Sequence, residues 1–126
     1  MPKNWDPAEA AEAIKQVYRR VLEREVDNSG LISWAGLLDR GEKTLREVIR
    51  LIGKSEEYRS RFILPLPLKQ AARLLYLHFL AREPESQQVV DGWANVIAES
   101  GFKAAIDGFI DSAEYRRRFG DDRVPG

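Results

Sequence analysis

Two stretches of this sequence, VYRRVLERE at residues 17–25 and LYLHFLARE at residues 75–83, decide the fold because the second is a variant of the first. Each is followed by one member of another related pair, SEEYRSRF at residues 55–62 and SAEYRRRF at residues 112–119. Equivalent residues are 58 positions apart in the first pair and 57 apart in the second. This spacing is longer than that of the common short solenoid repeats. The chain is therefore predicted to contain two copies of one supersecondary unit.

The segment between the paired stretches is also repeated. Each copy carries a tryptophan in its middle segment, Trp34 and Trp93, followed by a glycine that is expected to end a helix, Gly41 and Gly101. The predicted organisation is one domain over residues 1–126, with repeat one at 6–62, repeat two at 67–120 and a short C-terminal tail at 121–126.

Each copy is predicted to form four helical pieces. Asp6 followed by Pro7 is typical of a helix start, because Asp accepts backbone N–H bonds there and Pro needs no donor in the first turn. Apolar residues then recur at intervals of three and four, which gives one apolar helix face. Thr44 and Glu47 form a capping-box pattern at the third piece, and Ser55 is expected to cap the last. Few residues alternate with a strand period, so the predicted fold class is all-α, a helical bundle of two tandem four-piece repeats.

Residues 63–67, with the sequence ILPLP, separate the two copies. Their prolines prevent a continuous helix through the segment. Because the segment is apolar rather than rich in serine and glycine, we expect it to pack against the body of the domain and to hold the two copies together.

Composition excludes several classes of protein. The chain has 126 residues, 20 of them Lys or Arg and 20 Asp or Glu, and this zero net charge argues against binding to nucleic acid through phosphate neutralisation. The lack of cysteine excludes disulfides, thiolate metal sites, a cysteine nucleophile and a thioether-attached chromophore. No apolar run approaches the ~20 residues of a membrane span, and the N-terminus lacks a signal-peptide pattern. The chain is expected to be cytoplasmic and not inserted in a membrane.

Few groups suit catalysis or metal binding. The single histidine, His78, lies in an apolar helix with no Asp or Glu three or four residues away, and it is interpreted as a structural, hydrogen-bonded residue. Paired carboxylates such as Glu56 and Glu57 lie at helix starts, where they interact favourably with the helix dipole. Residues 27–30, DNSG, begin like a calcium loop but lack its terminal glutamate, and are interpreted as a turn. No catalytic or metal-binding residue is predicted, and the chain is predicted not to be an enzyme.

Arginine, which outnumbers lysine by 14 to 6, suits bidentate contacts with partner carboxylates. The candidate partner-binding residues are Arg59, Arg61, Arg116, Arg117, Arg118 and Arg123, with Trp5, Tyr58 and Tyr115 as aromatic contacts. The arginines are favoured because both copies present them. The alternative is that they pair with glutamates such as Glu23, Glu56 or Glu57. Aromatic residues at equivalent positions are mostly expected in the core, whereas Trp5 is expected to pack against the first helix or to protrude as an anchor.

The chain resembles the phycobilisome linker polypeptide domain. The resemblance rests on an opening helix reading YRRVLERE or YLHFLARE, a Trp-bearing helix, a glycine turn and a helix ending in S-x-E-Y-R-x-R-F. It is most specific in the C-terminal block GFKAAIDGFIDSAEYRRRFGDDRVPG, with its FGDDRVP ending. The resemblance covers nearly the whole chain.

This resemblance implies a non-catalytic, all-helical linker of the light-harvesting antenna without a covalently attached bilin. Such a linker lies in the central cavity of phycobiliprotein rings, formed by phycocyanin or allophycocyanin, assembles them and tunes energy transfer. The expected location is the cytoplasmic face of the thylakoid membrane, with other linkers as further partners and bilins of the rings within contact. The alternative is a helical repeat module of a bacterial surface or secreted protein, used for protein–protein contacts.

Overall fold

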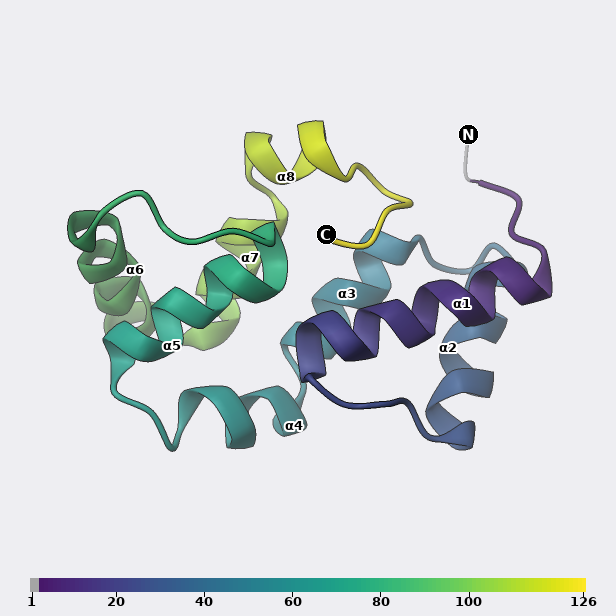
Figure 1. The fold of residues 1–126 in the computed structure, drawn as a ribbon, viewed down its shortest axis with the longest axis horizontal. Helices are drawn as coiled ribbons and strands as arrows, with labels where there is room; N and C mark the ends of the chain where they lie inside the picture. The colour runs from purple at the N-terminus through teal and green to yellow at the C-terminus, as the bar shows by residue number, and fades with distance from the viewer. Residues whose placement is uncertain (1–2) are drawn as a thin grey trace.

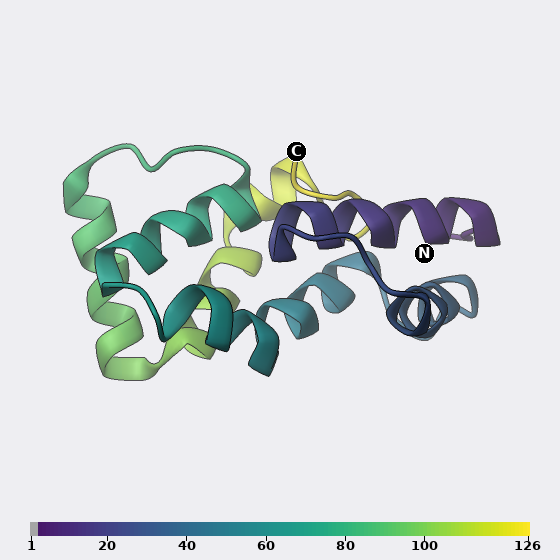
Figure 2. The same ribbon diagram turned by 60° about the horizontal axis from the view of Figure 1, so that its bottom comes forward.

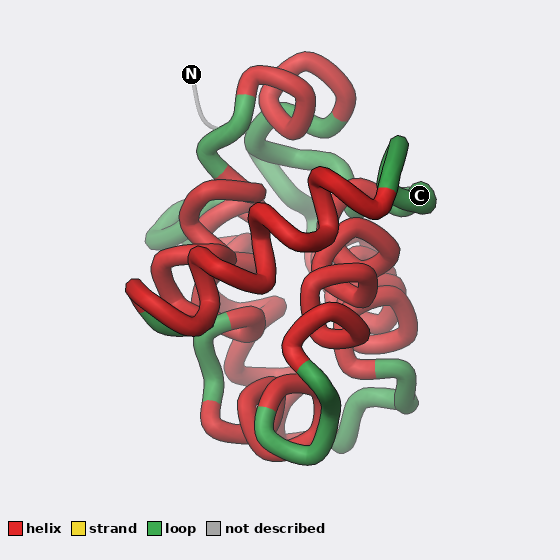
Figure 3. The backbone as a smooth tube through the Cα atoms, turned by 90° about the vertical axis from the view of Figure 1, so that its left-hand side faces the viewer, coloured by secondary structure: helices red, strands yellow, loops and turns green. Residues whose placement is uncertain are grey.

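The computed structural model describes residues 3–126, and every regular element in that range is helical (Figure 3). The eight α-helices are α1 (Pro7–Val17), α2 (Asn28–Asp39), α3 (Leu45–Gly53), α4 (Glu56–Tyr58), α5 (Leu68–Leu75), α6 (Gln87–Ser100), α7 (Phe102–Ile110) and α8 (Ala113–Arg118). Three π-helical segments, η1 (Tyr18–Leu22), η2 (Arg59–Ile63) and η3 (Tyr76–Leu80), continue α1, α4 and α5. The prediction of an all-α single domain is confirmed.

The helices begin where the sequence places their caps. Asp6 accepts hydrogen bonds from two backbone N–H groups in the first turn of α1. Thr44 and Glu47 form the predicted capping box of α3. Ser55 caps α4 and Ser112 caps α8 in the same way, each accepting from the N–H of the tyrosine three residues later. Each cap satisfies helix-start donors that would otherwise lack a partner.

The two opening helices end in the same unusual way. α1 and α5 each continue into a π-helical turn, and the next residue, Glu23 or Ala81, adopts a left-handed conformation with φ of 52° and 53° respectively. This conformation is uncommon for residues other than glycine, so the sequence pattern did not reveal it. The interpretation of residues 27–30 as a turn is wrong, because Asp27 is the N-cap of α2 and Asn28 begins that helix.

The first half of the chain (α1 to η2) and the second half (α5 to α8) lie side by side (Figure 1). In each half the opening helix packs against the next one, α1 against α2 and α5 against α6. The halves meet where α3 packs against α7 and η1 against η3, with α1–α2 and α5–α6 at opposite ends (Figure 2). After α8 the tail returns to the first half, where the backbone N–H of Arg46 donates to the carbonyl of Asp121 at 3.0 Å.

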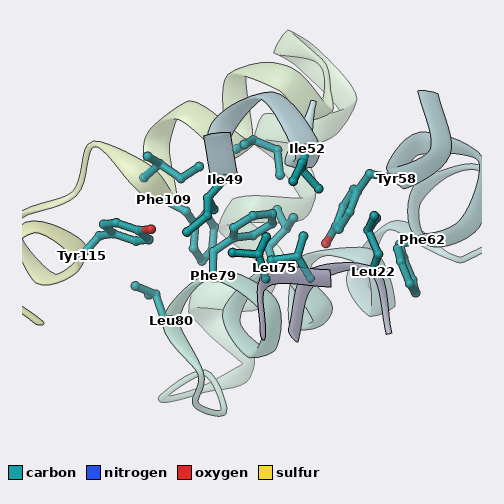
Figure 4. Packing of buried hydrophobic residues seen from close by; sticks show 14 of the residues in the cluster. Leu22, Ile49, Ile52, Tyr58, Phe62, Leu75, Phe79, Leu80, Phe109 and Tyr115 are labelled. Carbon is teal, nitrogen blue, oxygen red and sulfur yellow. The ribbon is translucent and has the colours of Figure 1, made fainter. Parts of the chain in front are cut away.

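One hydrophobic core runs through both halves. Phe79 and Ile49 lie at its centre, between Tyr58 on one side and Tyr115 on the other (Figure 4). The ring of Phe79 reaches α3 at Gly53, where an added Cβ would lie 2.8 Å from the ring Cζ atom. The halves therefore share a core and form one domain.

The segment between the halves packs less than expected. Ile63 is buried, but Leu64 is 60% exposed and both prolines, Pro65 and Pro67, are exposed. The expectation that the whole segment packs against the body is wrong. The contacts of η1, η3, α3 and α7 hold the halves together instead.

Candidate binding surface

The first half contains an internal arginine–glutamate clamp. Arg24 donates from Nε and Nη2 to the two carboxylate oxygens of Glu57, at 2.7 and 2.8 Å, and from Nη1 to the carbonyl of Glu25 at 2.9 Å. Its guanidinium also lies 5.0 Å from the ring centre of Tyr18. These hydrogen bonds raise the pKa of Arg24 and lower that of Glu57. The clamp joins the left-handed end of η1 to α4.

The second half repeats this clamp atom for atom. Arg82 donates from Nε and Nη2 to Glu114, both at 2.8 Å, and from Nη1 to the carbonyl of Glu83 at 2.9 Å. The guanidinium lies 5.0 Å from the ring centre of Tyr76. Arg82 holds the pKa of Glu114 at about 2, well below its usual value. The two clamps, Arg24–Glu57 and Arg82–Glu114, are hereafter the arginine clamps.

A second arginine makes equivalent hydrogen bonds in each half. Arg61 donates to the carbonyl of Leu22 and, at 3.1 Å, to the carboxylate of the first clamp. Arg118 donates to the carbonyl of Leu80 at 2.6 Å and to Glu114 at 2.9 Å. Both arginines thus satisfy carbonyl groups at the ends of η1 and η3. Their role in each half is to stabilise the fold.

A chain of hydrogen bonds joins the halves through the buried His78. Its Nδ1 lies 2.7 Å from the hydroxyl of Tyr58, and its Nε2 lies 2.6 Å from a carboxylate oxygen of Glu23. Burial lowers the pKa of His78, so the imidazole is neutral at pH 7. With a neutral ring, Tyr58 donates to Nδ1 and Nε2–H donates to Glu23. The interpretation of His78 as a hydrogen-bonded structural residue is confirmed.

The equivalent tyrosine of the second half has no such partner. The hydroxyl of Tyr115 is buried and makes no hydrogen bond with any described residue. Position 20 corresponds to His78 and carries Arg20, and position 81 corresponds to Glu23 and carries an alanine. Burial raises the pKa of Tyr115, so its hydroxyl remains protonated. The two halves are thus alike in their clamps and different in this polar chain.

Several ion pairs also join α3 and its C-cap residue to α7 and its C-cap residue. Arg50 contacts Asp107 and Asp111, each at 2.5 Å, and Lys54 contacts Asp107 at 2.7 Å. Arg46 contacts Asp111 at 2.5 Å. These pairs lower the pKa of both aspartates below their usual values. Sequence reasoning did not identify these pairs, because their members lie far apart in the chain.

The structure removes two aromatic residues from the predicted binding set. Tyr58 and Tyr115 are both 0% exposed, so neither ring offers surface to a partner. They lie inside because each fills the same position of the core in its half. Trp5, by contrast, is half-buried beside α1, with the ammonium of Lys3 4.2 Å from its ring centre.

The predicted arginines fall into two groups. Arg61 and Arg118 belong to the fold, as described, and Arg59 pairs with Glu56 at 3.1 Å on its own helix. Arg116, Arg117 and Arg123 are exposed and have no acidic group within 4 Å among residues 3–126. Position 113 explains part of this difference, since the second half has an alanine there where the first half has Glu56. We call Arg116, Arg117 and Arg123 the α8–tail arginines.

A cleft of about 730 Å³ opens where the halves meet, and we call it the junction cleft. Its lining comes from α1 and η1, from η3 and from the tail: Gln16, Arg19, Arg20, Glu23, Leu77, His78 and residues 124–126. In the described part of the chain, the cleft included, no group of three or more His, Asp or Glu side chains is placed to hold a metal ion. Within residues 3–126, no helix is both long enough and apolar enough to cross a bilayer.

The family described as "Phycobilisome Linker polypeptide" matches residues 5–126. The chain belongs to this linker family. Its relatives include a 39 kDa phycocyanin-associated rod linker of Microchaete diplosiphon, 36% identical over 97% of this chain and 43% of the relative. Another is a 32.1 kDa phycocyanin-associated rod linker of Synechocystis sp., 35% identical over 93% of this chain and 41% of the relative.

The chain is also similar to a much larger protein of Nostoc sp., the phycobiliprotein ApcE. It is 35% identical over 94% of this chain, which covers 11% of the relative. The chain spans less than half the length of these curated relatives. Its family is one of structural linker polypeptides, so the prediction of a non-catalytic protein is confirmed.

Proposed function

We propose that this chain is a ring-binding linker domain of the phycobilisome, which docks on phycobiliprotein rings and holds them in the antenna. The observation that carries the proposal is the match to linker polypeptides over residues 5–126. The names of the relatives supply the partner class, since two of them are phycocyanin-associated. The expected partners are phycocyanin or allophycocyanin rings, with other linkers as further contacts. The family match favours this function over a surface or secreted repeat module.

We assign the docking contact to the α8–tail arginines. All three are exposed on one short stretch, residues 116–123, which surrounds a shallow depression of about 310 Å³. Guanidinium groups without an internal partner are free to pair with partner carboxylates, and long-range attraction of this kind also speeds association. Trp5 remains a proposed aromatic contact at the N-terminal end of α1.

The domain organisation within this proposal is a duplication. Repeat one covers 6–62, repeat two covers 67–120 and the tail covers 121–126. The repeated arginine clamps and the matching left-handed ends of η1 and η3 support it. Within the antenna the chain would lie in the central cavity of a ring, on the cytoplasmic face of the thylakoid membrane. There its side chains would adjust the surroundings of bilins carried by the rings.

A co-elution experiment tests this function. The chain is mixed with purified phycocyanin hexamers, and separately with allophycocyanin, and each mixture is analysed by size-exclusion chromatography and fluorescence emission. We expect co-elution with one ring type and a shift of its emission maximum. Failure to co-elute with either ring, at concentrations well above micromolar, contradicts the proposal.

Two triple variants distinguish a specific contact of the α8–tail arginines from a general effect of positive charge on ring binding. The first is Arg116→Gln, Arg117→Gln and Arg123→Gln. The second is Lys43→Gln, Lys69→Gln and Lys103→Gln, which removes the same number of positive charges from other elements. We expect the arginine variant to lose at least tenfold in affinity and the lysine variant to lose much less. Equal losses would mean that net charge, not this surface, determines binding.

A further inference from the structure

The junction cleft contains an arginine, Arg20, that has no ion-pair partner in the described part of the chain. Arg20 lines the cleft, is exposed, and has no acidic group within 4 Å in the described part of the chain. Its neighbour Arg19 is held by Glu25 at 2.9 Å, and Arg24 belongs to a clamp. Arg20 is therefore the arginine of this turn that is available to a ligand.

Comparison of the halves shows that an arginine is not needed there for folding. The position equivalent to Arg20 carries His78, which is buried and bonded to Tyr58. Arginines that stabilise the fold, such as those of the arginine clamps, occur in both halves. Arg20 occurs in one half only and makes none of those bonds.

The cleft has the form of a site for a peptide segment. Its volume of about 730 Å³ exceeds that of one side chain and lies within the range of about 300–1,000 Å³ that is usual for ligand sites. Leu77, Val124 and Pro125 give it an apolar wall, while Arg20 and Gln16 give it polar groups. The carboxylate of Glu23 also faces the cleft but accepts a hydrogen bond from His78. This combination suits a carboxylate next to an apolar side chain better than a small free anion.

The tail connects the cleft to the proposed docking contact. Val124 and Pro125, which form one wall, directly follow Arg123, one of the α8–tail arginines. A partner that contacts Arg123 would therefore also lie next to the cleft.

We propose that the junction cleft receives an acidic segment of the partner ring, whose Asp or Glu carboxylate pairs with Arg20 while an adjacent apolar side chain packs on Leu77 and Val124. This inference rests on the proposed function and adds a second anchor, formed by both halves of the chain.

The test compares Arg20→Gln with Arg40→Gln, an exposed arginine on the loop after α2, in the binding of phycocyanin or allophycocyanin hexamers. We expect Arg20→Gln to weaken binding at least tenfold with an unchanged Tm, and Arg40→Gln to bind like the wild type. Wild-type affinity in Arg20→Gln overturns the inference but leaves the proposed function standing. If the wild type itself does not bind, the proposed function has failed.

A photo-crosslinking experiment identifies the occupant. A photoreactive amino acid replaces Gln16, an exposed residue at the cleft, and the complex with the ring is irradiated and analysed by mass spectrometry. We expect one main crosslinked peptide with an Asp or Glu beside an apolar residue. Crosslinks only to segments without an acidic residue, or none in an intact complex, contradict the proposal.

Discussion

The two halves of the chain place a tyrosine at the same position in the core but satisfy its hydroxyl differently. Tyr58 bonds to His78 and through it to Glu23, whereas the hydroxyl of Tyr115 has no described partner. The surrounding framework is the same, because each half keeps its arginine clamp. Features present in both halves therefore indicate what the fold requires. Features present in one half only mark where the two halves differ.

The largest expected effect comes from the residue that links the two halves at the core. Phe79→Ala should lower the free energy of unfolding by about 3–5 kcal/mol, as is usual for loss of a buried phenylalanine. The equivalent Val21→Ala should cost clearly less, since the smaller side chain leaves a smaller cavity. Urea denaturation of both variants measures the difference. Equal costs would contradict the central place of Phe79 between the halves.

The two tyrosines provide the sharpest contrast. Tyr58→Phe leaves the buried His78 without its donor and should cost about 1–3 kcal/mol. Tyr115→Phe removes a hydroxyl that already lacks a partner, so its effect should be close to zero or slightly stabilising. The same denaturation experiment compares them. A large cost for Tyr115→Phe would reveal a partner for that hydroxyl, such as a buried water.

The arginine clamps should contribute equally. Arg24→Ala and Arg82→Ala should each cost about 1–2 kcal/mol, in the lower part of the range for charged hydrogen bonds because the pairs are partly exposed. Arg117→Ala, the control on α8, should leave the stability unchanged. Unequal costs for the two clamps would show that one half is held together by other contacts.

The smallest expected effect is a pH dependence of stability that comes from His78, a residue whose equivalent in the first half is an arginine. The folded-state pKa of His78 is lowered from 6.5, so the unfolded chain takes up a proton first and stability falls as the pH drops below 6.5. In His78→Gln this slope between pH 7 and 5 should disappear. A second loss below pH 4.5 should remain in both proteins, because the clamp carboxyl of Glu114 has a pKa of about 2. Thermal unfolding across this range measures both slopes, and an unchanged slope in His78→Gln contradicts the assignment.

The sequence predicts the fold well because its signals are local. Asp6, Thr44 and Ser55 act on backbone groups within three residues, and the apolar stripes repeat along each helix. The polar chain through His78 could not be predicted, since its members come from three separate segments. Nor could the left-handed conformation at Glu23, which the tertiary structure imposes on a residue other than glycine.

The sequence is least informative about which candidate binding residues are used inside the fold. Repetition of arginine in both copies favours Arg61 and Arg118 as partner contacts, yet in the structure these two arginines bond to a carbonyl group and a carboxylate of their own half. The buried positions of Tyr58 and Tyr115 follow the same logic.

Arg59 and Arg116 are also a repeated pair, but only Arg59 has an acidic partner, Glu56, because the second half carries an alanine at that position. The arginines without an internal partner are therefore the better candidates for binding. Arg20 could have been found from its mismatch with His78 at the equivalent position.

The most direct test of this distinction measures ring binding and thermal stability for two matched double variants. Arg24→Gln with Arg82→Gln removes the repeated arginines of the clamps, and Arg116→Gln with Arg117→Gln removes the same charge from α8. The α8 variant should lose affinity for phycocyanin or allophycocyanin hexamers and keep the wild-type Tm. The clamp variant, measured below its melting temperature, should keep its affinity and show a lower Tm. The opposite pattern would contradict the division of arginines into those that fold the chain and those that bind its partner.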